Sequence, residues 1–276
     1  MYKRQAFASC HGAPGVTTTV VGLAAAWPGA RRPLVIEADP DGGVLAARFE
    51  DLHADRTLAE VAVDARRTYD HDRLLATARP LWGAVPVVVA PPSAEQAAAA
   101  LATAGERLAA GLAASAEVVL VDVGRLTTRS PALPLARPAE MVVLVARAGF
   151  EDAASLAPRC AELRGAGCRP GLVVVGRSPY RPEELAESAQ VELLGCLPAD
   201  AAAAAVLAGG AGSDRRLRRS LLWRSLVDLA ARLAAAAAVA DPDQGSDDPV
   251  TATVAAALAS SNGRTPHDAS TPGAGR

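Results

Sequence analysis

Short apolar runs alternate along the chain with longer segments rich in Ala, Leu and Arg. Most of the short runs lack a polar residue at every second position, which is typical of strands buried on both faces of a parallel sheet. Strands are predicted at Ala6–Cys10, Pro33–Glu37, Val85–Ala90, Val118–Asp122, Met141–Ala146, Leu172–Gly176 and Leu193–Cys196. Helices are predicted at Thr17–Trp27, Ser93–Ser115, Glu151–Gly165, Pro182–Ala189, Ala199–Leu207 and Arg216–Val239. This alternation predicts an α/β fold: a doubly wound, mostly parallel sheet with helices on both faces and ligands at the carboxyl ends of the strands.

The two ends of the chain differ from this pattern. Residues 241–276 begin with a turn-rich acidic stretch and contain few large apolar residues, so we predict a disordered tail. Within it, Val250–Ala259 lacks cations and large apolar residues and makes a poor membrane anchor. Residues 1–5 look like the translation of a sequencing adapter and include the only lysine, Lys3. We interpret them as an artefact that replaces the natural N-terminus, which leaves residues 6–240 as one domain.

Composition narrows the class of protein. The chain has 276 residues, 50% of them hydrophobic, and a net charge of −2. This predicts a globular domain with a sizeable core and gives no general reason to expect nucleic-acid binding. No apolar run reaches the roughly 18 residues of a membrane-spanning helix. The four cysteines form no C-x-x-C pair, so we expect free buried thiols in a cytoplasmic protein rather than a metal or redox site.

The segment His11–Thr19 follows the first predicted strand and opens the first predicted helix. Its glycines allow backbone N–H groups to surround phosphate oxygens, and a threonine hydroxyl there can bind Mg²⁺. The nucleotide contacts predicted from this phosphate loop are Gly12, Ala13, Pro14, Gly15, Val16, Thr17 and Thr18. Val16 stands where such a loop carries the lysine for the outer phosphates, so we expect weak or absent hydrolysis. Binding of ATP or ADP through backbone amides and Mg²⁺ remains open, as does a plain Gly/Pro turn.

Two further predicted strands end in carboxylates. Glu37 and Asp39 are two residues apart and so share one face, and Asp122 ends the strand Val118–Asp122. Together with Thr17 they predict a Mg²⁺ site, in which Asp39 is the catalytic candidate that orients an attacking water. The alternative is a turn in which Asp39-Pro40-Asp41-Gly42 only caps the strand. After Asp122, Gly124 lets the backbone approach a phosphate, and Arg125 is either a compensating cation or a solvated loop residue.

These three segments, in this order, resemble the ParA/MinD superfamily of ATPases with a deviant Walker A motif. The family pattern is KGGVGKTT, a strand ending in D-x-D-P and a Walker B strand. On that pattern His11 stands at the signature lysine, Val16 at the phosphate-loop lysine and Thr17 at the Mg²⁺ ligand. Asp39 stands at the water-activating aspartate and Asp122 at the Walker B aspartate. The signature lysine reaches across an ATP-bound dimer, so its absence weakens the case for a homodimer that depends on ATP.

The resemblance extends to the C-terminal half. The segments Leu172–Arg177 and Leu194–Asp200 resemble the family's strand and loop beside the base, which implies contacts from Arg177, Pro198 and Asp200. The chain resembles a degenerate, actinobacterial MinD-like member, similar to the TadZ/CpaE type. This implies a role in positioning or regulating a larger assembly, with protein partners from a pilus, secretion or chromosome-partitioning system. Two alternatives stay open: a slow, partner-stimulated ATPase and a non-specific DNA-binding partition module.

The DNA-binding alternative depends on Arg215, Arg216, Arg218 and Arg219. Members of the superfamily bind DNA through basic residues of this region. Cations at the start of a helix oppose its dipole, which favours a role outside the predicted helix Arg216–Val239. A solvated charged turn is the other interpretation.

Overall fold

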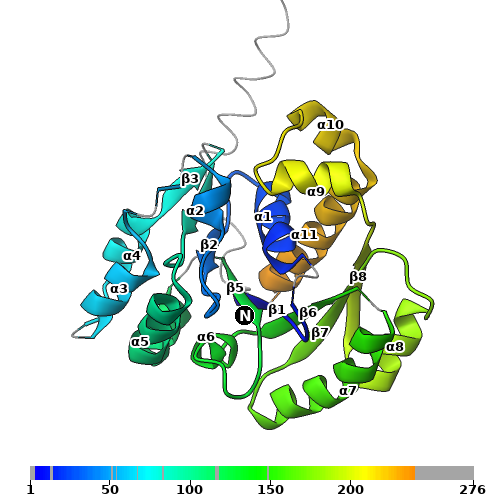
Figure 1. The fold of residues 1–276 in the computed structure, drawn as a ribbon, viewed down its shortest axis with the longest axis horizontal. Coiled ribbons are helices and arrows are strands. Elements are labelled where there is room, and N and C mark those ends of the chain that lie inside the picture. Colours follow the sequence, from blue (N-terminus) through cyan, green and yellow to red (C-terminus); the bar gives the residue numbers. More distant parts are fainter. Residues whose placement is uncertain are drawn as a thin grey trace, which may run out of the picture. The chain divides into compact units, whose positions relative to one another are not determined.

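The computed structural model describes residues 4–239 except residues 13, 14, 51, 54, 67, 83, 116, 117 and 148, and gives only the backbone of residues 237–239. An eight-stranded sheet with the order β3-β4-β2-β5-β1-β6-β7-β8 lies between two layers of helices (Figure 1). All neighbouring strands are parallel except β3, which is antiparallel to β4. The predicted fold class is confirmed. The strands are β1 Arg4–Ser9, β2 Leu34–Glu37, β3 Arg79–Leu81, β4 Val85–Val88, β5 Val119–Arg125, β6 Met141–Ala146, β7 Pro170–Val175 and β8 Glu192–Leu197.

The helices cover both faces of this sheet. On one face lie α3 Leu58–Ala65, α4 His71–Thr77, α5 Ala94–Ala114, α6 Leu133–Ala136, α7 Phe150–Gly165 and α8 Pro182–Ala189. On the other lie α1 Val16–Ala26, α2 Leu45–Arg48, α9 Ala201–Leu207, α10 Asp214–Arg219 and α11 Leu221–Val239. None of the helices in the described part of the chain is both long and apolar enough to cross a membrane.

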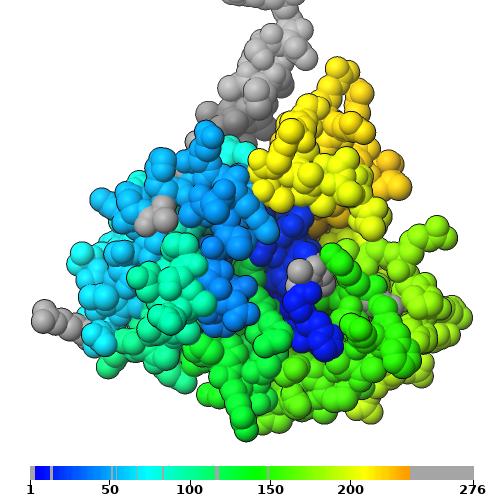
Figure 2. Space-filling model, viewed as in Figure 1, coloured from blue at the N-terminus to red at the C-terminus, as the bar shows by residue number. Residues whose placement is uncertain are grey.

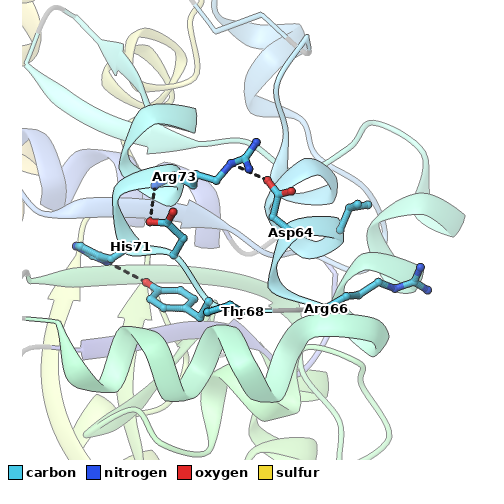
Figure 3. A pocket seen from close by; sticks show the side chains of 8 residues that line it. Asp64, Arg66, Thr68, His71 and Arg73 are labelled. Carbon is cyan, nitrogen blue, oxygen red and sulfur yellow. Dashed lines mark hydrogen bonds and ion pairs between the residues drawn. The ribbon is translucent and has the colours of Figure 1, made fainter.

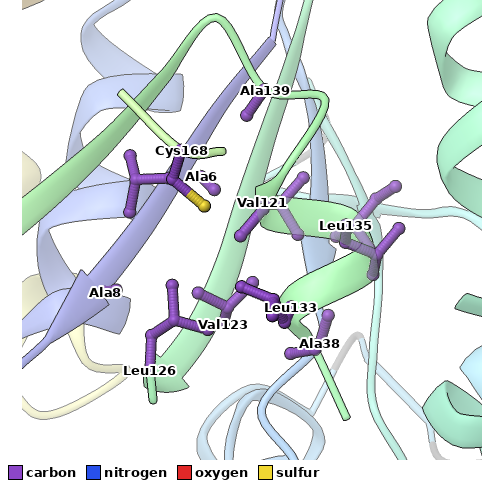
Figure 4. Close-up of a cluster of buried hydrophobic side chains, with 14 of the residues drawn as sticks. Ala6, Ala8, Ala38, Val121, Val123, Leu126, Leu133, Leu135, Ala139 and Cys168 are labelled. Atoms are coloured by element: carbon purple, nitrogen blue, oxygen red, sulfur yellow. The ribbon is translucent and has the colours of Figure 1, made fainter. Parts of the chain in front are cut away.

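Each central strand divides its side chains between two apolar cores. Ala6 and Ala8 of β1 belong to the core beneath α5, α6 and α7, whereas Phe7 belongs to the core beneath α1 and α11. Figure 4 shows part of the first core, where Val121 and Val123 of β5 lie beside Leu133 of α6. Because both faces of the strands are buried, their apolar runs are continuous rather than alternating.

The last predicted helix is two helices. Instead of Arg216–Val239, the chain forms α10 and α11, and Ser220 between them is extended, with ψ of 156°. The Ser220 hydroxyl accepts a hydrogen bond from the Trp223 amide at 3.0 Å, which is the geometry of an N-cap. Arg216, Arg218 and Arg219 therefore lie in the last turn of α10, where cations interact favourably with the helix dipole. The argument that they oppose a dipole was wrong.

Other differences from the predicted elements are local. Helices α2, α3, α4 and α6 and the edge strand β3 were not predicted. Strand β1 begins at Arg4, so the structure places Arg4 and Gln5 in the sheet, and the interpretation of residues 1–5 as an artefact stays a prediction. Three cysteines are buried as expected, but Cys196 is exposed. The predicted tail, residues 241–276, lies outside the described residues.

Candidate functional site

The predicted phosphate loop leaves the central strand β1 at Ser9 and enters α1 at Val16. Gly15 caps this helix in the left-handed conformation, with φ of +100°, which glycine adopts without strain. Val16 is only 6% exposed and belongs to the apolar core beneath α1 and α11. The residue at the lysine position therefore serves packing. Of the other predicted loop contacts, Ala13 and Pro14 lie outside the described residues.

A cavity of about 800 Å³ opens at the carboxyl ends of the parallel strands, where the start of α1 is accessible. In Figure 2 the dark blue first segment comes to the surface between the lighter blue residues 40–50 and the yellow residues 200–215. The predicted site residues that line this nucleotide cavity are Gly12, Gly15, Val16, Thr17, Thr18, Asp39, Gly124, Arg177, Pro198 and Asp200. Glu37 and Asp122 are not among the lining residues, because both are 1% exposed behind it.

The buried carboxylate of Asp122 bears most directly on whether the site can bind a cation. Its Oδ1 accepts a hydrogen bond from the Gly124 amide at 3.1 Å. Its Oδ2 is buried and has no hydrogen bond of regular geometry within the described part of the chain. Burial raises the pKa of Asp122 to about 7, and the nearby Thr17 hydroxyl and Gly124 amide oppose this shift. A buried carboxylate with only weak hydrogen bonds to one of its oxygens is costly, so this oxygen is suited to a bound cation or water.

The described side chains do not form a complete metal site. No cluster of three or more His, Cys, Asp or Glu able to hold a metal occurs among the described residues. Mg²⁺ keeps several waters and takes one or two protein ligands beside substrate phosphates, so a predicted Mg²⁺ site needs no such cluster. Thr17 and Asp122 supply such a partial set.

Asp39 lies against the backbone of β5. Gly124 has φ of +59°, and a Cβ placed there would come within 2.2 Å of the Asp39 Cγ. Gly124 therefore makes room for a carboxylate, whereas the sequence predicted room for a phosphate. The Asp39 Oδ1 also accepts a hydrogen bond from the Asp41 amide at 2.9 Å. Asp39 thus forms a turn and also lines the cavity, and its role with Mg²⁺ and water stays a prediction.

Glu37 has a different environment from the one the sequence predicted. Its Oε1 accepts hydrogen bonds from the Val44 and Leu45 amides, at 2.7 and 3.0 Å. Its Oε2 accepts one from the Ala90 amide at 3.0 Å. Both carboxylate oxygens therefore bind backbone amides, and Glu37 connects the start of α2 to the residues that follow β4. Because these bonds occupy the side chain and bury it, we leave Glu37 out of the Mg²⁺ ligands.

Four arginines line the nucleotide cavity: Arg48, Arg125, Arg147 and Arg177. None of the four guanidinium groups forms an ion pair among the described residues. Arg48 and Arg147 were not predicted from the sequence as site residues. Arg147 directly follows the carboxyl end of β6, a position that could have been recognised, whereas Arg48 ends a short unpredicted helix. Asp200, predicted to border the base, caps α9 by accepting a hydrogen bond from the Ala203 amide.

A second cavity, of about 710 Å³, lies between α3 and α4. Figure 3 shows that its side chains bind one another, because Arg73 pairs with Asp64 and Tyr69 bonds to His71. The Tyr69 ring also lies where a Cβ of residue 111 would be, so Gly111 on α5 receives it. These contacts give the residues that line the second cavity a structural role in the fold.

The arrangement of the sheet, the loop and the cavity has counterparts among solved structures. A ParA family ATPase from Chlorobium tepidum matches with a TM-score of 0.68 and 17% identity, over 83% of this chain and 97% of that one. The septum site-determining protein MinD from Pyrococcus horikoshii, complexed with Mg-ADP, matches with a TM-score of 0.67 and 18% identity, over 87% and 98%. This chain has the ParA/MinD fold. The ATP complex of Cyanothece McdA(D38A) also matches, at 0.60 and 17%, over 85% and 96%.

These likenesses concern three-dimensional structure. No protein-family model and no curated protein sequence matches the chain. The ParA/MinD fold is thus present here with a loop sequence that lacks both lysines of the family pattern. Other matching structures are a MinC:MinD cell division protein complex from Aquifex aeolicus and a putative plasmid partition protein from Borrelia burgdorferi bound to AMPPNP.

Proposed function

We propose that this chain binds ATP or ADP with Mg²⁺ in the nucleotide cavity and uses it as a conformational ligand rather than a rapidly hydrolysed substrate. The observation that carries the proposal is the buried Asp122 carboxylate beside the Thr17 hydroxyl at the start of α1, whose Oδ2 has no hydrogen bond of regular geometry within the described part of the chain. A plain turn gives no reason to hold such a carboxylate there, since an unpaired buried acceptor lowers stability.

The proposed role of each residue follows from its position in the cavity. The backbone amides of Gly12 and of Gly15 to Thr18 surround the phosphates, and the N-terminus of α1 favours their negative charge. Thr17 and Asp122 hold Mg²⁺, which neutralises phosphate charge when bound. Asp39 faces the same space and positions a water. Arg177, Pro198 and Asp200 border the base at the other side of the cavity.

Slow hydrolysis of the nucleotide follows from the missing lysine of the phosphate loop. The phosphate-loop lysine stabilises charge that develops on the outer phosphates, and the buried Val16 side chain supplies no charge. With hydrolysis weak or absent, we propose that the bound nucleotide sets the shape in which the protein meets its partners. Positioning or regulation of a larger assembly, in a pilus, secretion or partition system, is the role we assign to that state. The structural neighbours that are partition and cell-division proteins support this role.

Titration calorimetry with Mg-ATP and Mg-ADP tests the proposal. Wild-type protein should release or absorb measurable heat with a single site per chain. Thr17→Ala should weaken binding about 10-fold or more with Mg²⁺ present and much less with Mg²⁺ chelated, because the lost hydroxyl serves the metal. Thr128→Ala, an exposed threonine outside the cavity, is the matched control. No heat at millimolar nucleotide would refute nucleotide binding and leave a scaffold with an inactive fold.

Exposed arginines favour a second candidate function, a weak non-specific contact with DNA. Arg215, Arg216, Arg218 and Arg219 are all exposed on α10, although Arg218 is partly engaged by Asp214 at 2.7 Å. Substituting Arg215, Arg216 and Arg219 together with Gln should abolish retention of the protein on DNA at low salt. Absence of retention by the wild type under the same conditions would eliminate this candidate.

A further inference from the structure

The positive charge that lines the nucleotide cavity comes from arginine side chains. Lys3 is the only lysine in the sequence, and it lies outside the described residues. The cations that line the cavity are therefore arginines, and they face the carboxylates Asp39, Asp41 and Asp200. A site with a phosphate loop but no loop lysine needs another group to balance a polyphosphate.

Two of these arginines stand on the strands that flank β1. In the sheet, Arg125 at the end of β5 is the register partner of Ser9, the last residue of β1. On the other side, β6 pairs with β1 through Ala8 and Leu144, and Arg147 is the first residue after β6. The phosphate loop that leaves β1 is thus bracketed by one arginine from each neighbouring strand.

The backbone fixes both positions. The Leu126 amide donates to the Ser9 carbonyl at 3.2 Å, which ties the residue after Arg125 to the start of the loop. The Arg147 amide donates to the Asp152 Oδ2 at 2.9 Å, which ties Arg147 to the first turn of α7. Both side chains are exposed and form no ion pair with another described residue, so the guanidinium groups remain available to a ligand.

We propose that Arg125 and Arg147 together replace the absent loop lysine and bind the β- and γ-phosphates of the nucleotide. This inference rests on the proposed nucleotide binding and adds the specificity of the site: it selects for a polyphosphate chain and takes its charge from within one subunit. A guanidinium group donates to two phosphate oxygens at once and stays charged at any physiological pH, so it suits this role.

Binding of Mg-ATP, Mg-ADP and AMP to four proteins tests the inference. The proteins are wild type, Arg125→Gln, Arg147→Gln and the double variant, with Arg129→Gln as the control. Arg129 is exposed four residues beyond Arg125 but does not line the cavity. We expect each single variant to bind ATP about 10-fold more weakly and the double variant about 100-fold, with AMP affinity unchanged. Thermal unfolding should show unchanged stability, because both side chains are exposed.

The outcomes separate this inference from the proposed function. If wild type binds ATP and the double variant binds it equally well, the arginine pair is refuted while nucleotide binding stands. An equal loss for ATP and AMP would also refute it, because the arginines would not be acting on the outer phosphates. If wild type binds no nucleotide, the proposed function fails, and the inference with it.

Chemical modification gives a second readout that needs no variant. Acetylation removes the charge of amines and leaves the arginines charged, so ATP affinity should survive it. An arginine reagent such as phenylglyoxal should abolish binding. Peptide mass mapping with ATP present should show protection of Arg125 and Arg147 but not of Arg129. Loss of affinity on acetylation, or equal modification of all three arginines, would contradict the inference.

Discussion

Replacing Asp122 with Asn isolates the free-energy cost of keeping this carboxylate in the core. Burial raises its pKa from 3.8 to about 7, so the folded protein binds the proton more tightly than the unfolded chain does. The group therefore contributes stability at acid pH that is lost as the pH rises from about 4 through 7. Between pH 5.5 and 8 the loss is about 2 kcal/mol, at about 1.4 kcal/mol per pH unit until ionisation is complete. Asn keeps the acceptor for the Gly124 amide and does not ionise.

The measurement is urea unfolding of both ligand-free proteins at constant ionic strength over this pH range. We expect the variant to gain about 2 kcal/mol of unfolding free energy relative to wild type between pH 5.5 and 8. Asp228→Asn, which removes an exposed carboxylate from α11, should leave the pH profile nearly parallel to that of wild type. Parallel profiles for Asp122→Asn and wild type would refute the raised pKa and with it the argument that burial disfavours the charged Asp122 carboxylate.

Three further predictions follow from the same site. Gly124→Ala should lower the unfolding free energy by about 2 kcal/mol or more, because φ is +59° and the new Cβ meets Asp39; Gly149→Ala, in open space, should cost less than about 0.5 kcal/mol. Equal costs in chemical denaturation would contradict this. Glu37→Ala should cost about 3 kcal/mol or more in the same assay, since three backbone N–H groups lose their acceptor, and a cost below about 1 kcal/mol would be inconsistent. Binding of Mg-ATP at pH 7 should release about half a proton from Asp122, and none at pH 9. Calorimetry in two buffers of different ionisation enthalpy measures this release. Absence of release at pH 7 would count against Asp122 as a metal ligand.

The sheet was predictable because its strands are buried on both faces. The apolar runs located β6 without error and the other predicted strands to within a few residues. The short elements escaped because a helix of eight residues offers barely two turns of periodicity. A signal for α3 was nevertheless present, since Thr57 and Glu60 form a capping box at its start. Strand β3 has three residues, including Pro80, and only the edge of a sheet accepts such a strand.

The site was predictable where strand ends determine position. Asp39, Asp122 and the loop before α1 follow from the rule that parallel strands present their carboxyl ends at one edge. Glu37 could not be judged in this way, because its role depends on a loop and a strand end that fold over it from residues 44, 45 and 90. Arg48 belongs to the site through the packing of α2 beside the cavity, which no local pattern encodes.

The pairing of α1 with α11 has a consequence for the order in which the protein is made. Gly22 of α1 provides a notch in which a Cβ would come within 2.7 Å of Leu226 on α11, and Figure 1 shows the two helices side by side. The helix α1 is thus synthesised almost 200 residues before α11, the helix that covers it. Contacts between such distant segments form slowly, and exposed apolar helices are prone to aggregation until they are covered. The first helix after the predicted phosphate loop therefore gains its apolar cover only once α11 has been synthesised.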